Sequence, residues 1–185
     1  MPYTTVRRVL PHEYPKYRAH LKALDRESKT LRFANPLSDE VIDKLCNKWE
    51  QDHAHNVLFC IEDNSLDFVA VGHIALYNEM ELAFSVLKQY QGHGMGSLLM
   101  KRVIQWCRTN GKLKGNMVCL STNQVIKHLC LKHGIHIHNE HGETMADIEL
   151  DNPNITTYLT EATDSNLAVM DYLGKRFAKP LDMLK

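Results

Sequence analysis

The sequence has no excess of charge, no long apolar run and no linker. Its 22 basic and 22 acidic residues cancel, so the charge balance predicts neither a nucleic-acid partner nor an anionic membrane surface. No apolar stretch approaches the ~20 residues needed to cross a bilayer, and Met1–Thr4 does not begin a signal peptide. No repeat or low-complexity segment divides the chain. We therefore expect a compact cytoplasmic protein.

Paired cysteines are also missing. No Cys-x-x-Cys pair occurs, and most of the cysteines lie within runs of apolar periodicity. This placement predicts buried free thiols in a reducing compartment rather than disulfides or a metal site. The cysteines are Cys46, Cys60, Cys107, Cys119 and Cys130.

A glycine-rich turn, Tyr90–Leu99, is the most informative segment that is present. Residues 80–86 before it alternate large apolar residues with small or polar ones, which is the period of a strand. Apolar residues after it recur at helical spacing. A helix that begins at such a turn has unpaired backbone N–H groups at its start, and these favour an anion, most often a phosphate. An ordinary tight turn is the alternative.

Two common phosphate-binding loops do not fit this turn. A Walker loop ends in Gly-Lys-Ser or Gly-Lys-Thr, whereas Gly96 is followed by Ser97 and Leu98. The dinucleotide-binding fingerprint needs a third glycine where Ser97 stands. The spacing that does fit is Gln-x-x-Gly-x-Gly, from Gln91 through Gly94 to Gly96. This pattern resembles the acyl-coenzyme A motif of the GNAT superfamily of N-acetyltransferases.

A second segment resembles the next motif of the same family. That motif begins with an asparagine and continues with apolar, basic and glycine residues at fixed spacing, matched here by Asn123, Ile126, Leu129, Lys132, Gly134 and Ile135. The segment also predicts an amphipathic helix with an asparagine N-cap and a glycine after its end. Two motifs in order identify the chain as a member of the family.

The resemblance implies that the cofactor is acetyl-CoA and that particular residues bind it. The backbone of the strand would pair with the pantetheine arm, the amides of the glycine-rich turn would hold the pyrophosphate, and Asn123 would contact the pantetheine. The predicted cofactor-binding residues are Phe84, Ser85, Val86, Gln91, Gly92, His93, Gly94, Met95, Gly96, Ser97, Asn123 and Cys130.

Glu81 is the predicted catalytic base. It shares a strand face with Ala83 and Ser85, whose small side chains leave room for a substrate. The run 81–86 resembles a strand of protein-lysine acetyltransferase-like members, in which a glutamate at this place is the proposed base. Glu79 is the nearby competitor, and a partly solvated edge carboxylate is the structural alternative. Val118 stands where some other members of the family carry their glutamate base, and because valine cannot accept a proton, this position is excluded as the catalytic base.

Cys130 departs from the commoner family pattern. Many members have a tyrosine seven residues after the motif asparagine, where it protonates the leaving thiolate, but here Cys130 occupies that position. The thiol either donates a proton or packs beside the cofactor. The departure weakens a two-residue acid–base mechanism, and the segment 28–33 echoes an element of the protein-lysine branch.

The order of elements resembles the GNAT fold, an α/β (α+β) fold with a mixed central sheet flanked by helices. We expect one domain at residues 1–150 and an extension at 151–185 packed on it. Strands are expected at 4–10, 57–62, 68–77, 80–86 and 116–120, and in a hairpin at 136–150 that turns at 141–143. A helix is expected from residue 14 to a break near 35–36, and further helices are expected after Ser38, after the glycine-rich turn and after Asn123.

The last segment lies outside the resemblance. Residues 155–159 are predicted to form one more strand, and Asp164 or Ser165 to cap a helix that carries Leu167, Met170, Leu173 and Phe177. We expect a packing or homodimer-forming appendage, with a substrate lid as the alternative.

His136 and His138 share a strand face at a spacing that can bind zinc, but exposed strand faces often carry polar pairs, and we predict no metal site. The sequence thus predicts an N-acetyltransferase that uses acetyl-CoA and a primary amine, either a small molecule or a protein lysine or N-terminus, in a ternary complex. A non-catalytic acyl-CoA sensor or interaction domain is the alternative.

Overall fold

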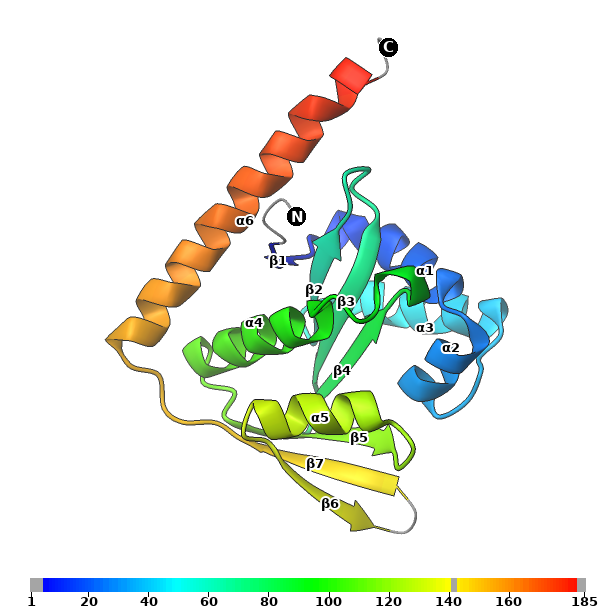
Figure 1. Ribbon diagram of the computed structural model, residues 1–185, viewed down its shortest axis with the longest axis vertical. Coiled ribbons are helices and arrows are strands. Elements are labelled where there is room, and N and C mark those ends of the chain that lie inside the picture. The colour runs from blue at the N-terminus through cyan, green and yellow to red at the C-terminus, as the bar shows by residue number, and fades with distance from the viewer. Residues whose placement is uncertain (1–4, 141–142, 183–185) are drawn as a thin grey trace.

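The computed structural model describes residues 5–140 and 143–182. A seven-stranded sheet with the order β1-β2-β3-β4-β5-β7-β6 forms its centre (Figure 1). The strands are β1 (Arg7–Arg8), β2 (Asn56–Glu62), β3 (Phe68–Leu76), β4 (Met80–Val86), β5 (Lys114–Leu120), β6 (His136–Glu140) and β7 (Glu143–Glu149). The helices are α1 (Tyr14–Ala23), α2 (Arg26–Phe33), α3 (Asp39–Gln51), α4 (Met95–Thr109), α5 (Gln124–Lys132) and α6 (Ile155–Asp182), with short 3₁₀ turns η1 (Pro11–Glu13) and η2 (Lys88–Tyr90).

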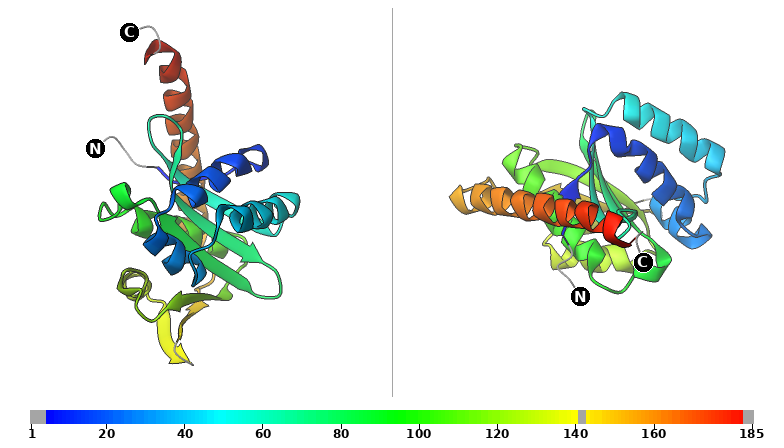
Figure 2. Two further views of the ribbon diagram at one scale, coloured as in Figure 1. Left: turned by 90° about the vertical axis from the view of Figure 1, so that its right-hand side faces the viewer. Right: turned by 90° about the horizontal axis from the view of Figure 1, so that it is seen from above.

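Helices cover both faces of the sheet at β2 and β3 (Figure 2). On one face, α4 and α5 bury the larger apolar cluster, to which α4 contributes Leu99, Val103 and Trp106. On the other, α1 and α3 bury a second cluster that includes Tyr17 and Ile42. Every residue of β2 is buried because both of its faces are covered. The mixed sheet flanked by helices confirms the predicted fold class.

One strand junction divides the sheet. All neighbouring strands are antiparallel except β4 and β5, which are parallel and pair only at Met80↔Gly115 and Glu81↔Asn116. A Cβ at Gly115 would lie 2.2 Å from the carbonyl oxygen of Met80, so the close approach of the two strands requires glycine there. Beyond Glu81 and Asn116 the two strands part.

The helix that follows the second motif begins as the sequence predicts. The side-chain oxygen of Asn123 accepts a hydrogen bond from the backbone N–H of Ile126 at 3.1 Å, and α5 ends before Gly134, whose φ is +71°. All five cysteines are buried free thiols, as predicted.

The strand predicted at 155–159 is wrong, and so is the helix start at Asp164 or Ser165. These residues all belong to α6, which begins at Ile155. Asn154 caps it: its side-chain oxygen accepts from the N–H of Thr157 at 2.9 Å, while the hydroxyl of Thr157 accepts from the N–H of Asn154 at 3.1 Å. This reciprocal cap overrides the strand preference of the β-branched residues that follow.

Other elements differ less from the prediction. The first strand is confined to Arg7–Arg8, and the first helix ends at Ala23, so that α2 is a separate helix capped by Asp25. The hairpin of β6 and β7 is present, but residues 141 and 142 of its turn lie outside the described residues. No helix in the described ranges combines the length and the apolar character that a membrane crossing requires.

Candidate active site

A cavity of about 560 Å³ lies beside the end of β4, beyond the two residue pairs that join this strand to β5. The end of β4, the glycine-rich turn, the start of α4, one side of α5 and part of α2 line it. Most of the predicted cofactor-binding residues line this cavity together: Phe84, Ser85, Val86, Gln91, Gly92, Gly94, Met95, Gly96, Ser97 and Asn123.

The glycine-rich turn presents the start of α4 to the cavity. Gly92 and Gly94 have φ values of +79° and +80°, a backbone conformation that favours glycine, and the space beside both is open. Gly94 is the N-cap of the 15-residue helix α4 and has no side chain that could satisfy the first N–H groups. These groups, on residues 95–97, therefore remain available to an anion.

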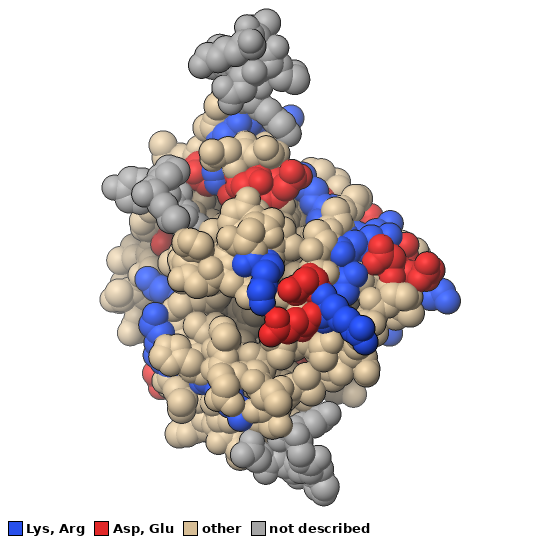
Figure 3. Space-filling model, turned by 45° about the vertical axis from the view of Figure 1, so that its right-hand side comes forward, with Lys and Arg blue, Asp and Glu red and all other residues tan. Residues whose placement is uncertain are grey.

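The charges around the cavity also suit an anion. Arg32, His128 and Lys132 line it, and none of its lining residues in the described part of the chain is a carboxylate. Elsewhere, acidic and basic side chains alternate, as over α1–α3, where Arg18 and Lys22 pair with Asp43 (Figure 3). The cavity thus differs in charge from the mixed surface around it.

Hydrogen bonds fix the turn in place. The side-chain amide of Gln91 donates to the carbonyl oxygen of Val86 at 3.0 Å and to the hydroxyl of Ser28 at 3.2 Å. Ser97 contacts His133 at the end of α5, with Oγ 3.2 Å from Nε2. Gln91 therefore ties the turn to β4 and α2, and Ser97 ties α4 to α5.

Two predicted residues do not line the cavity. His93 is exposed in the turn, with its Nδ1 3.3 Å from the carbonyl oxygen of Tyr90. Cys130 is fully buried in the apolar cluster beneath α5, and this burial raises the pKa of its thiol to about 11. Its placement is that of a core residue.

Ser85 forms a buried hydrogen bond with His20 of α1. Nδ1 of His20 lies 2.8 Å from the carbonyl oxygen of Phe68, which can only accept, so Nδ1 carries the proton. Nε2 then accepts, and it lies 2.8 Å from the hydroxyl of Ser85. Burial lowers the pKa of His20 to about 4, which keeps the ring neutral. The Ser85 hydroxyl therefore donates to His20 and offers its lone pairs to other donors.

Arg32 is a cavity residue that the sequence did not assign. The side-chain nitrogen of Asn56 donates to the carbonyl oxygen of Asp52 and to the hydroxyl of Tyr77, both at 2.8 Å. Its oxygen, 3.0 Å from Nε2 of His73, therefore accepts from that ring nitrogen. Burial holds the pKa of His73 well below its usual value, so Nδ1 is an acceptor, and Nη2 of Arg32 lies 3.3 Å from it. A neutral imidazole thus positions the guanidinium at the cavity.

Glu81 is an exposed residue of β4, at the last residue pair that joins β4 to β5. It does not line the cavity described above. Its competitor Glu79 precedes the strand and accepts a hydrogen bond from the side chain of Asn116 at 3.0 Å. The two carboxylates are therefore in different settings, since Glu79 is already paired.

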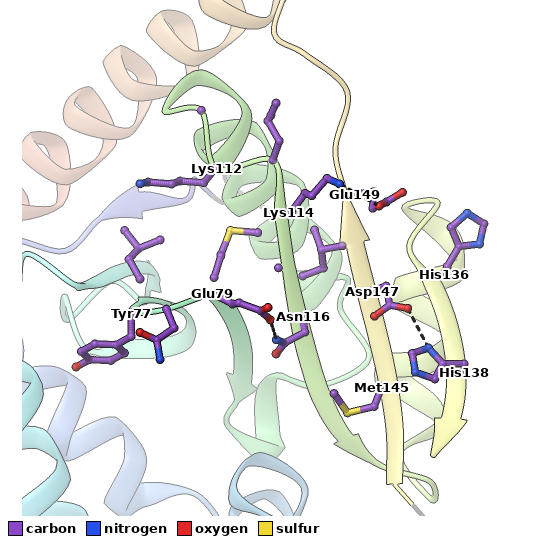
Figure 4. Close-up of a pocket in the computed structure, with 17 residues that line it drawn as sticks. Tyr77, Glu79, Lys112, Lys114, Asn116, His136, His138, Met145, Asp147 and Glu149 are labelled. Atoms are coloured by element: carbon purple, nitrogen blue, oxygen red, sulfur yellow. Dashed lines mark hydrogen bonds and ion pairs between the residues drawn. The ribbon is translucent and has the colours of Figure 1, made fainter. Parts of the chain in front are cut away.

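Glu79 lines a second, open cavity of about 940 Å³ on the uncovered side of β5, β7 and β6 (Figure 4). Lys112 and Lys114 lie at one end, and Asp147 and His138 face each other at the other, with Nδ1 3.0 Å from the carboxylate. Its mixed charges distinguish it from the first cavity.

The histidine pair that suggested zinc lies in this second cavity. His136 and His138 line it, as the strand spacing predicted. Within residues 5–140 and 143–182, no group of three or more metal-ligating side chains is close enough to hold a metal ion.

Comparison with solved structures finds the same fold in several acetyltransferases. The GNAT domain of S. lividans PAT is 20% identical, with a TM-score of 0.66 over 78% of this chain and 89% of that chain. YncA from Salmonella typhimurium, solved with its cofactor acetyl-CoA, is 15% identical, with a TM-score of 0.63 over 82% and 96%. Spermidine N-acetyltransferase from Vibrio cholerae, in complex with CoA and spermine, is 17% identical, with a TM-score of 0.60 over 78% and 92%.

A search of curated protein sequences finds no significant match. A family model, by contrast, matches residues 19–135, which include both motifs, and its description is the acetyltransferase (GNAT) family. The match spans more than half of the chain and confirms the resemblance inferred from Gln91–Gly96 and Asn123–Ile135. The chain therefore belongs to the acetyltransferase (GNAT) family.

Proposed function

We propose that the protein transfers the acetyl group of acetyl-CoA to a primary amine by direct attack within a ternary complex. Membership of the family makes it an acyltransferase. The observation that carries the finer proposal is the cavity beside the end of β4, which combines the start of α4 with basic side chains and has no lining carboxylate in the described part of the chain. YncA, of similar fold, holds acetyl-CoA.

The residues present fit the cofactor. The N–H groups of residues 95–97 would bind the pyrophosphate, and Arg32 or Lys132 would add positive charge. The backbone of Phe84 and Val86, which β5 leaves unpaired, would bind the pantetheine as an added strand. Bound acetyl-CoA supplies the acetyl group as a reactive thioester.

Ser85 and Glu81 have complementary roles toward the amine. Since the hydroxyl proton of Ser85 is directed to His20, its oxygen would accept a hydrogen bond from an amine N–H and orient the amine. Glu81, on the same strand face, would accept the proton that the amine loses. Deprotonating a lysine amine with a pKa of ~10.4 costs about 4.6 kcal/mol at pH 7, and a nearby base offsets part of this cost by accepting the proton.

The acceptor is a small-molecule amine or a protein lysine or N-terminus. The spermidine acetyltransferase of similar fold holds spermine, a small polyamine.

Acetyl-CoA binding is tested by thermal unfolding and isothermal titration calorimetry with the full chain. The proposal expects a rise in Tm and a saturable heat, and neither would appear if the cavity did not bind the cofactor. Release of CoA is then measured with a panel of amines, amino-acid termini and peptides. Binding without turnover toward any acceptor class would favour the alternative, a non-catalytic acyl-CoA sensor.

The role of Glu81 is tested with Glu81→Gln, and Glu79→Gln is the matched control. We expect Glu81→Gln to lower kcat by about 10²–10⁴ at pH 7, the usual contribution of a general base, and to lose less as pH rises and more amine is neutral. Glu79→Gln should keep the rate within a few-fold. Wild-type rates for Glu81→Gln from pH 6 to 9 would exclude it as the base.

We also propose that residues 1–150 form the catalytic domain and 151–185 an extension packed on it. The contacts of α6 with α4 and β1 support this division. The five buried thiols are compatible with a reducing compartment such as the cytoplasm.

A further inference from the structure

Helix α6 is oriented with its polar side toward the rest of the protein. Arg102 of α4 binds both Glu161 and Ser165, the latter at 2.9 Å. Toward the other end, the hydroxyl of Thr5 donates to Asp171 at 2.6 Å, and Lys175 donates to the carbonyl oxygen of Glu62 at 3.1 Å. Polar contacts therefore fix the helix in one orientation along α4 and β1.

The opposite side of α6 is apolar and open to solvent. The 28-residue helix is about 42 Å long, and its end extends past the sheet (Figure 1). Large apolar side chains that are between 41% and 80% exposed follow its outer side: Ile155, Tyr158, Leu159, Leu167, Val169, Met170, Leu173 and Phe177. This arrangement inverts the usual amphipathic helix, whose apolar side faces its own core.

The exposed area matches one side of a stable dimer. At about 150 Å² for a large apolar side chain, these exposed fractions leave on the order of 700 Å² of apolar surface. A standard interface buries ~800 Å² per partner. Arg176 is the only charged residue at an exposed position of α6 within residues 155–178, so a second copy would meet almost no repulsion. A nucleic acid would find almost no phosphate contacts there.

Three pairs of residues on this face are symmetric about Asn166, whereas Tyr158, Leu167 and Val169 have the smaller residues Gly174, Ser165 and Thr163 as their counterparts. Ile155 and Phe177 lie at equal distances along the sequence from Asn166, and so do Leu159 and Leu173, and Ala162 and Met170. A two-fold axis through Asn166 would therefore place each of these residues beside its counterpart when two helices pack antiparallel. Such self-complementarity is what an isologous interface requires. A polar residue at the axis favours one register, as a buried asparagine does in coiled coils.

We propose that the outer face of α6 is a homodimer interface, in which α6 of a second copy packs antiparallel with the axis at Asn166. The interface is on the far side of α6 from α4, so each copy keeps its own acetyl-CoA cavity. The proposal is independent of the acceptor and of catalysis.

The mass of the full chain in solution tests the interface. Light scattering after size exclusion should give twice the chain mass of 21.3 kDa for the wild type and the single mass for Met170→Glu. Leu131→Glu changes a leucine of similar exposure on α5 and should remain dimeric. The proposal would be overturned if the wild type were monomeric at all concentrations, including the case in which it binds anionic lipid vesicles instead. A dimeric Met170→Glu would also overturn it.

Disulfide formation tests the register without a destabilising charge. Asn166→Cys, at the axis, should give a disulfide-linked dimer on mild oxidation, because the native cysteines are all buried. Thr156→Cys, exposed but away from the axis, should remain monomeric on a non-reducing gel. A linked dimer for Thr156→Cys, or none for Asn166→Cys, would contradict the antiparallel register.

Discussion

Replacing Arg7 by methionine should expose how strongly one guanidinium holds two buried carboxylates. Its Nη atoms donate to the two oxygens of Glu13 at 2.7 Å each, and its Nε donates to Glu62 at 2.9 Å. Both glutamate side chains are only 3% exposed. Breaking a buried ion pair by removing one partner costs about 3–5 kcal/mol, because the remaining charge stays buried. For a chain of this size, the Tm should fall by roughly 6–20 °C.

The pH dependence of this loss has a defined sign. Burial alone raises the pKa of Glu13, but hydrogen bonds from Arg7 and from the backbone of Leu10 bring it below its usual value. In the wild type, Glu13 therefore stabilises the fold above its unfolded pKa of 4.5, and this stability is lost as pH falls through the lower folded pKa. Without Arg7, only the backbone of Leu10 and the ammonium group of Lys16, 3.8 Å from the carboxylate, still oppose the effect of burial on the pKa of Glu13, so the variant should lose less stability than the wild type as pH falls. The difference between the two proteins should be largest near pH 7 and shrink below about pH 5.

Urea unfolding of both proteins at several pH values measures this difference. The neighbouring Arg8→Met, at an exposed position, is the control and should change stability by less than about 1 kcal/mol. Adding Glu13→Gln to Arg7→Met should recover part of the loss at pH 7. A cost for Arg7→Met that stayed constant from pH 4 to 7, or equalled that of Arg8→Met, would refute the reasoning.

Two further perturbations address the site and its support. Gly94→Ala and Gly134→Ala both place a side chain at a positive φ with open space around it, so backbone strain should cost each variant about 1–2 kcal/mol of stability. Calorimetry should find weakened acetyl-CoA binding only for Gly94→Ala. Equal affinities of the two variants would show that the turn does not contact the cofactor. His20 has a pKa of about 4 when folded and 6.5 when unfolded, so its contribution is complete above pH 6.5 and falls by on the order of 3 kcal/mol toward pH 4. His20→Gln should therefore lose less stability over this range in urea unfolding, and an unchanged pH profile would contradict a neutral buried ring.

The sequence predicted best the parts of the site that are built by local backbone. Gly94, Gly96 and Asn123 have roles set by their own turns and caps, so their spacing sufficed to place them. Arg32 lines the same cavity from a distant helix, and its position depends on a hydrogen bond to His73, which sequence spacing does not encode. Cys130 occupies a motif position, but its side chain is buried in the core and does not line the cavity, which spacing alone does not reveal.

The C-terminal segment shows why local preference fails without its context. Ile155, Thr156 and Thr157 favour a strand when considered alone, but the reciprocal cap with Asn154 starts a helix, and Gln105 of α4 donates to the carbonyl oxygen of Thr157. The helical spacing of Leu167, Met170 and Leu173 is confirmed, since all three residues belong to α6. Which side these residues face depends on Arg102, whose partners Glu161 and Ser165 could not be identified from spacing.

The junction at Gly115 joins the two halves of the sheet over a very short stretch. The pairs Met80↔Gly115 and Glu81↔Asn116 connect β4 with β5, and the two strands separate along the rest of their length. Because β5 does not pair with the rest of β4, and no residue of β5 lines the 560 Å³ cavity, a substitution at Gly115 or Met80 would act on that cavity only through this short joint.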